Sequence, residues 1–166
     1  MEMILPPKRK EKFQIGFTLL GGHKMEELFE LKAYIEQGRY AEALLVIEEM
    51  EEMAKDDKIN KIYSFMVVLL LHLIKKDAEQ RTTRSWEYSI WNSSYQIRRV
   101  NKRRKSGGFY LSQQEIREVI EEAYPDALKR AALEVFEGQY TETQLEAMIN
   151  QKQIQQNAFE MIYEQE

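Results

Sequence analysis

Two histidines and one dense cluster of basic side chains are the residues of this sequence best suited to chemistry. His72 stands in the apolar run Leu-Leu-Leu-His-Leu-Ile, and His23 stands alone near the N-terminus. A general base needs a nucleophile or an acid within reach, and a zinc site needs Cys or His at close spacing. The sequence marks neither, so we interpret His72 as a buried structural imidazole and expect no metal site and no cofactor. Catalysis by His72 with nearby carboxylates is the alternative.

The basic cluster lies between residues 98 and 105. It consists of Arg98, Arg99, Lys102, Arg103, Arg104 and Lys105. Tyr88, Trp91 and Tyr95 precede it at helical spacing, so phosphate contact combined with base stacking is one interpretation. The opposing interpretation has these aromatic side chains packed on neighbouring helices and the cations paired with Glu-rich helices. A pI of about 5.5 favours the opposing interpretation, because nucleic-acid-binding domains are usually basic.

Composition indicates a water-soluble protein without disulfides. The 166 residues are 43% hydrophobic and 31% charged, with 7 Gly, 3 Pro and no Cys. The longest uninterrupted apolar run, at 65–71, is far shorter than the roughly 20 residues of a membrane-spanning helix. We therefore predict a cytoplasmic protein that does not enter a membrane.

The formal net charge of −4 conceals strong segregation along the chain. Residues 25–60 carry 4 basic and 11 acidic side chains, whereas residues 72–108 carry 10 basic and 3 acidic ones. In one interpretation the acidic helices pack beside the basic one and neutralise it. In the other, a basic face is offered to an acidic partner.

Helical periodicity dominates from Met25 onward and predicts an all-α fold. We expect a compact bundle of five or six helices around a central helix at 57–78, which is apolar on all sides near its middle. Residues 25–166 should form a single helical domain, and residues 1–24 a poorly ordered N-terminal arm. The other predicted helices cover 25–37, 41–55, 84–105, 112–137 with a kink at Pro125, and 141–163 as one helix or a pair. We expect the first of them to end at Gly38 and the later helices to be capped by Asp56-Asp57, by Thr82 or Thr83, and by capping boxes at Ser112 and Thr141.

Several short motifs in this order resemble the bacterial, largely cyanobacterial, family called domain of unknown function 29. They are Gly-Arg-Tyr at 38–40, Leu-Leu-Leu-His-Leu-Ile-Lys at 69–75, Arg-Thr-Thr-Arg-Ser-Trp at 81–86, Glu-Glu-Ala-Tyr at 121–124 and Tyr-Thr-x-x-Gln-Leu at 140–145. The resemblance implies an all-helical fold and no particular activity. It marks His72, Lys75, Arg84 and Trp86 as motif positions, to which we assign structural roles.

These observations favour a non-enzymatic helical interaction or assembly module over an enzyme. Its partner would be another protein or a second copy of the chain in a homodimer. The alternative is a nucleic-acid-binding protein that uses the basic residues 98–105. We further expect Arg84 to form an ion pair with Glu121 or Glu122, or to cap a helix.

Overall fold

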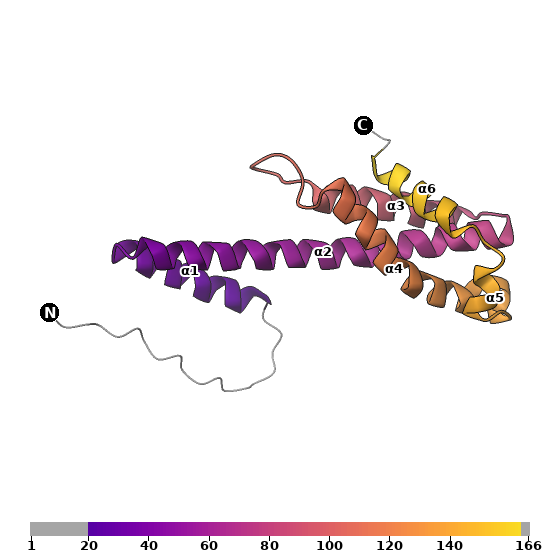
Figure 1. Ribbon diagram of the computed structural model, residues 1–166, viewed down its shortest axis with the longest axis horizontal. Helices are drawn as coiled ribbons and strands as arrows, with labels where there is room; N and C mark the ends of the chain where they lie inside the picture. The colour runs from indigo at the N-terminus through magenta and orange to yellow at the C-terminus, as the bar shows by residue number, and fades with distance from the viewer. Residues whose placement is uncertain (1–19, 164–166) are drawn as a thin grey trace. The chain divides into compact units, whose positions relative to one another are not determined.

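The computed structural model describes residues 20–163, and the side chains of residues 25–163, in two compact units. The units are Met1–Met50 and Glu51–Glu166, and one long helix contributes to both. All named elements within the described residues are helical (Figure 1), which confirms the predicted all-α class. None of these helices is both long and apolar enough to span a membrane. The single domain over 25–166 stays a prediction.

Six α-helices and one 3-10 helix make up the described chain, which agrees with the five or six helices predicted. They are α1 Leu20–Glu36, α2 Tyr40–Glu79, α3 Arg84–Asn101, α4 Gln113–Glu134, η1 Val135–Gly138, α5 Glu142–Glu146 and α6 Gln151–Tyr163. The first helix begins at Leu20, before the predicted boundary at residue 25. The rest of the predicted N-terminal arm, residues 1–19, lies outside the described residues.

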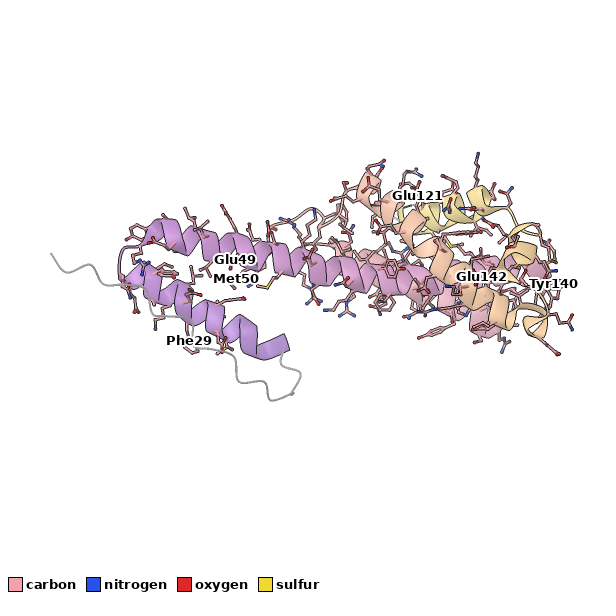
Figure 2. All side chains as sticks on the ribbon, turned by 60° about the horizontal axis from the view of Figure 1, so that its bottom comes forward. Phe29, Glu49, Met50, Glu121, Tyr140 and Glu142 are labelled. Carbon is pink, nitrogen blue, oxygen red and sulfur yellow. The ribbon has the colours of Figure 1, made fainter. Side chains whose placement is uncertain are left out.

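In the first unit, α1 and the start of α2 lie side by side and form a helical hairpin (Figures 1 and 2). The turn between them depends on Gly38, whose φ of +68° is readily reached only by glycine. The Gly38 N–H donates to the Ile35 carbonyl at 3.1 Å, and the Arg39 N–H to the Tyr34 carbonyl at 2.8 Å. This pair of bonds is the Schellman motif, which ends a helix by satisfying its last carbonyls.

The predicted break between the helices at 41–55 and 57–78 is absent, because both ranges belong to α2. The prediction was wrong because it treated Asp56-Asp57 as a helix cap. No Gly or Pro interrupts Tyr40–Glu79, so nothing in the backbone stops the helix. Asp57 instead accepts from Lys61 at 2.9 Å, an i,i+4 pair that supports a continuous helix.

In the second unit, the later part of α2 is the central helix, as predicted. Its largest fully buried side chains are Ile62, Met66, Leu69, Leu70 and Ile74. Apolar residues of α3, α4 and α6 belong to the same core cluster. The helix can be buried on several sides because its sequence is apolar in every direction at that level.

The caps of α3, α4 and α5 follow from sequence. Thr83 accepts from the Trp86 N–H at the start of α3, and the two capping boxes, at Ser112 and Thr141, are both formed. In α4 the helix runs through Pro125 without a break, so the proline does not end it. The kink expected there stays a prediction.

Candidate functional site

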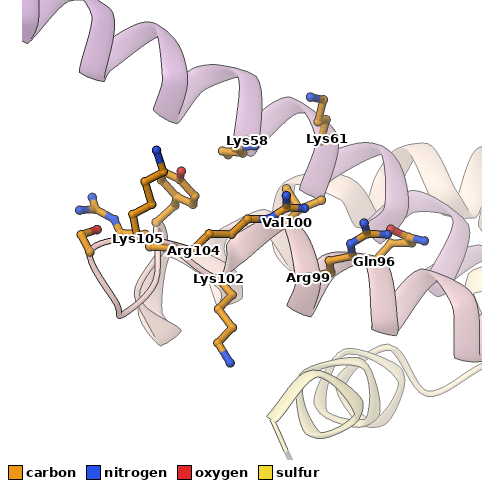
Figure 3. A pocket seen from close by; sticks show the side chains of 11 residues that line it. Lys58, Lys61, Gln96, Arg99, Val100, Lys102, Arg104 and Lys105 are labelled. Atoms are coloured by element: carbon orange, nitrogen blue, oxygen red, sulfur yellow. The ribbon is translucent and has the colours of Figure 1, made fainter.

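A groove in the second unit brings together most of the predicted basic cluster. Its volume is about 580 Å³, and it lies between α2, the end of α3 and the loop that follows (Figure 3). Seven of the 11 lining residues are basic and none is acidic: Lys58, Lys61, Arg99, Lys102, Arg103, Arg104 and Lys105. We call this hollow the basic groove. Figure 3 shows Lys58 and Lys61 on α2 across from Arg104 and Lys105 on the loop.

The loop that carries four of these cations begins where α3 ends at Asn101, not at residue 105 as predicted. The helix stops there because Asn101, which is only 2% exposed, bonds to the backbone across the loop. Its Oδ1 accepts from the Leu111 N–H at 2.8 Å, and its Nδ2 donates to the Leu111 carbonyl at 3.2 Å. A buried amide with both ends satisfied holds residues 102–110 as a closed loop.

Backbone contacts inside the loop fold it back on itself. Lys102 and Phe109 form an antiparallel bridge, and the Arg103 N–H donates to the Gly108 carbonyl at 2.9 Å. Gly107 and Gly108 both have φ near +70°, which lets the chain reverse at this point without Cβ strain. The cations of the loop are therefore attached to a hydrogen-bonded backbone.

The positive charge of the basic groove is largely uncompensated. Among residues 25–163, Lys61 alone of the seven cations lies within 4 Å of a carboxylate, that of Asp57. Lys58 and Arg103 approach the Tyr110 ring instead, at 5.6 Å and 5.2 Å from its centroid. Within the second unit, the expected pairing of the cluster with Glu-rich helices is therefore not formed.

Arg98 is the one member of the predicted cluster that does not line the basic groove. Its Nη1 donates to the Met161 carbonyl at 2.6 Å, so it ties α3 to the last turn of α6. Two groove cations, Lys58 and Lys61, were missed from sequence. The signal that could have found them is their i,i+3 spacing, which puts both on one face of α2.

Three aromatic side chains form an exposed stripe along α3. Tyr88, Trp91 and Tyr95 are all exposed, with Trp91 at 52%. The Trp91 and Tyr95 rings stack at 5.5 Å with an interplanar angle of 9°, and Tyr88 lies 5.8 Å from Trp91. The expectation that these rings pack on neighbouring helices is wrong. We call this set the aromatic stripe.

The family-motif residues Lys75 and Trp86 meet in a second cluster. Lys75 is buried, forms an ion pair with Glu134 of α4, and holds its Nζ 4.6 Å from the centre of the Trp86 ring. Arg81 lies 4.8 Å from the same ring and pairs with Glu79. These cation–π contacts and ion pairs join α2, α3 and α4, which supports a structural role for the motif.

Glu79 extends this cluster to an unusual backbone segment. Its other carboxylate oxygen accepts from the Phe136 N–H at 3.1 Å. Phe136 and Glu137 both have positive φ, at 49° and 57°, a conformation that non-glycine residues seldom adopt. The Glu79 carboxylate thus holds a strained turn between α4 and α5.

The remaining motif residues, His72 and Arg84, lie outside this cluster. The His72 Nδ1 lies 2.9 Å from the Val68 carbonyl of its own helix, and the ring is half-buried. No group of three metal-binding side chains occurs among the described residues. Arg84 is exposed at the start of α3 and forms no ion pair with Glu121 or Glu122, so the ion-pair form of that hypothesis is wrong for the described residues. The side chain that caps α3 is that of Thr83.

The hairpin of the first unit carries a different kind of surface. Large apolar side chains there are between 37% and 65% exposed: Met25, Leu28, Phe29 and Ile35 on α1, and Tyr40, Leu44, Leu45 and Ile47 on α2. Phe29 projects from the outer side of α1 in Figure 2. We call residues 25–50 the acidic hairpin, because they include 7 acidic and 2 basic side chains.

A family model described as "Domain of unknown function DUF29" matches residues 36–163. No curated protein and no solved structure matches the chain. The matched range includes the basic groove, the aromatic stripe and the Lys75–Trp86 cluster, whereas nearly all of α1 precedes it. Because the match covers well over half of the sequence, the chain belongs to the family of the domain of unknown function DUF29.

Proposed function

We propose that this protein is a non-enzymatic assembly module that pairs with a second copy of itself through the acidic hairpin. The observation that carries the proposal is the set of eight large apolar side chains exposed on residues 25–50. Scattered exposed apolar residues are normal, but a dense set on one small element is typical of an interaction surface.

The hairpin alone offers these side chains little cover. Within residues 25–50, Ala43 and Val46 are the buried residues, and their spacing of three puts both on one face of α2. Two helices in contact bury one stripe each, so an apolar residue outside that stripe needs another helix to cover it.

The spacing of the exposed residues suits a symmetric dimer. On α1 they recur at 25, 28, 29 and 35, and on α2 at 40, 44 and 47, which is one stripe per helix, whereas Leu45 lies outside the α2 stripe. Helical geometry places the two stripes on the same side of the antiparallel hairpin. Two copies placed face to face would form a four-helix bundle, and a two-fold interface of this kind is the commonest in homo-oligomers.

The negative charge of the hairpin should make this pairing depend on salt. Each hairpin has a net charge of −5, so two copies repel one another at low ionic strength. We therefore expect the dimer to become tighter as salt is added. A partner protein with a basic apolar helix would show the opposite dependence.

The test is the molar mass of the full chain by light scattering after size exclusion, over a range of protein and salt concentrations. We expect a dimer whose dissociation constant falls with salt, and at least tenfold weaker pairing for Leu28→Asp and Leu44→Asp. Leu133→Asp is the matched control, because Leu133 is equally apolar and exposed on α4. A monomer under all conditions, or a dimer that the control weakens as much, would overturn the proposal.

A further inference from the structure

We infer that the basic groove and the aromatic stripe together bind single-stranded nucleic acid. This site lies in the second unit and uses none of the residues of the acidic hairpin. The inference therefore stands or falls independently of the dimer.

The groove concentrates charge of a single sign. Seven cations line a hollow of about 580 Å³ without an acidic neighbour in the lining. Such a site lowers the free energy of a ligand with several negative charges much more than that of a single anion. The ligand is thus a polyanion.

The cations of the loop are attached to a hydrogen-bonded backbone. Asn101 closes the loop through Leu111, and Lys102 pairs with Phe109 through the backbone. Lys58 and Arg103 both lie against the Tyr110 ring. Binding then costs less conformational entropy than it would for a mobile basic tail.

The aromatic stripe and the basic groove adjoin one another on α3. Tyr88, Trp91, Tyr95 and Arg99 follow one another at steps of three, four and four residues, so they share a face of α3. From Tyr88 to Arg99 this face extends about 16 Å along the helix. Arg99 also lines the groove, so the stripe leads directly into it.

A single-stranded nucleic acid matches both features. Its phosphates suit the cations of the groove, and its unpaired bases have flat faces that stack on exposed aromatic rings. A duplex hides those faces inside its own stack, and an inorganic polyphosphate has none. Tyr95 and Trp91 are already parallel to one another, which suits a ladder of stacked bases.

The experiment measures fluorescence anisotropy of labelled single strands, of RNA and of DNA, of about 12 nucleotides with the full chain across a salt series. In the groove variant, Arg103, Arg104 and Lys105 are each changed to Glu. The matched control changes Lys129, Arg130 and Lys152 to Glu, which alters the net charge equally but away from the groove. Circular dichroism establishes that each variant is folded.

We expect the groove variant to bind at least 100-fold more weakly at low salt, and the control to bind within threefold of the parent chain. The slope of log K against log salt should fall in magnitude by about 2 when three phosphate contacts are removed. Equal losses in the control, or no binding of either strand by the parent chain, would overturn the inference.

Stacking has its own test at Trp91. Trp91→Leu should weaken binding by about 5- to 150-fold without changing the salt slope, and Trp91→Phe should restore most of the affinity. An unaffected Trp91→Leu variant, equal affinity for a duplex, or stronger binding to phosphatidylserine vesicles would show a general anion surface and contradict the inference. Leu44→Asp should leave strand binding intact, which separates this site from the dimer.

Discussion

The acidic hairpin exposes apolar side chains to solvent, whereas the basic groove exposes cations. In the hairpin, exposed apolar residues alternate with glutamates, and the missing complement is another apolar face. In the groove, exposed cations cluster on a closed loop, and the missing complement is negative charge. The two proposals therefore predict opposite salt responses for two surfaces of one small helical protein. Apolar contact between like-charged hairpins is strengthened by screening, whereas phosphate contact is weakened by it.

The largest change in the free energy of unfolding is expected in the core of the second unit, and a much smaller one on the surface of the first unit. Leu70 is fully buried on α2, whereas Leu44 on the same helix is largely exposed. Leu70→Ala should lower the free energy of unfolding by about 2–5 kcal/mol, because it leaves a cavity. Leu44→Ala should change the stability of the monomer by less than about 0.5 kcal/mol. Urea denaturation at low protein concentration measures both, and equal losses would contradict the comparison.

A smaller effect is expected at the frame of the basic groove. Asn101→Ala removes two hydrogen bonds and leaves the Leu111 backbone groups without their partner, at a cost of about 1–3 kcal/mol. Because the loop is then no longer closed, strand binding should also weaken. Denaturation and anisotropy test the two consequences, with Asn92→Ala on the same helix as the control. Unchanged strand binding would mean that the frame does not organise the cations.

Tyr124 offers a change that should stabilise the protein. Its hydroxyl is buried without a hydrogen-bond partner among the described residues, and burial raises its pKa to about 12. Tyr124→Phe should therefore raise the free energy of unfolding by about 1 kcal/mol at neutral pH. The native state also holds this proton more tightly than the unfolded chain, whose tyrosines titrate near 10.0. Stability should fall as pH rises from about 10 to about 12, and this fall should be smaller in the Phe variant.

The smallest effect concerns the ion pair that joins α2 to α4 through Lys55 and Glu115. Lys55 donates to Glu115 at 2.8 Å, and this contact, together with the Ser112 backbone N–H, lowers the pKa of Glu115. A lowered carboxyl pKa adds stability above the pKa of the unfolded state, and this stability is lost as pH falls through the folded pKa. Glu115→Gln should reduce the acid dependence of the melting temperature, with exposed Glu118→Gln as the control. Identical pH curves for the two variants would contradict this assignment.

Local rules in the sequence predicted the caps and the central helix correctly. Gly38, Thr83, Ser112 and Thr141 have the structural roles expected of them, since a cap is a contact among a few consecutive residues. The burial of Ile62, Met66, Leu69, Leu70 and Ile74 followed from a helix that is apolar all round near its middle. The break at Asp56-Asp57 was wrong because an aspartate caps a helix only where the backbone already leaves the helical conformation.

The groove could be predicted from the sequence only in part, because its lining residues come from three segments: α2, the end of α3 and the loop that follows. The density of cations at 98–105 was visible, but the contributions of Lys58 and Lys61 depend on how α2 passes the loop. The turn of Arg98 toward Met161 depends on where α6 ends. The end of α3 at Asn101 depends on a bond to Leu111, ten residues later.

The helical class, the apolar centre of α2, the caps and the segregation of charge can all be predicted without the structure, because each follows from composition or from residues close together in the chain. Tertiary structure alone decided which charges meet and which side chains stay exposed. Burial and ion pairing depend on what lies across the interface, so only the packed chain leaves most of the groove cations without a carboxylate within 4 Å and Trp91 in solvent.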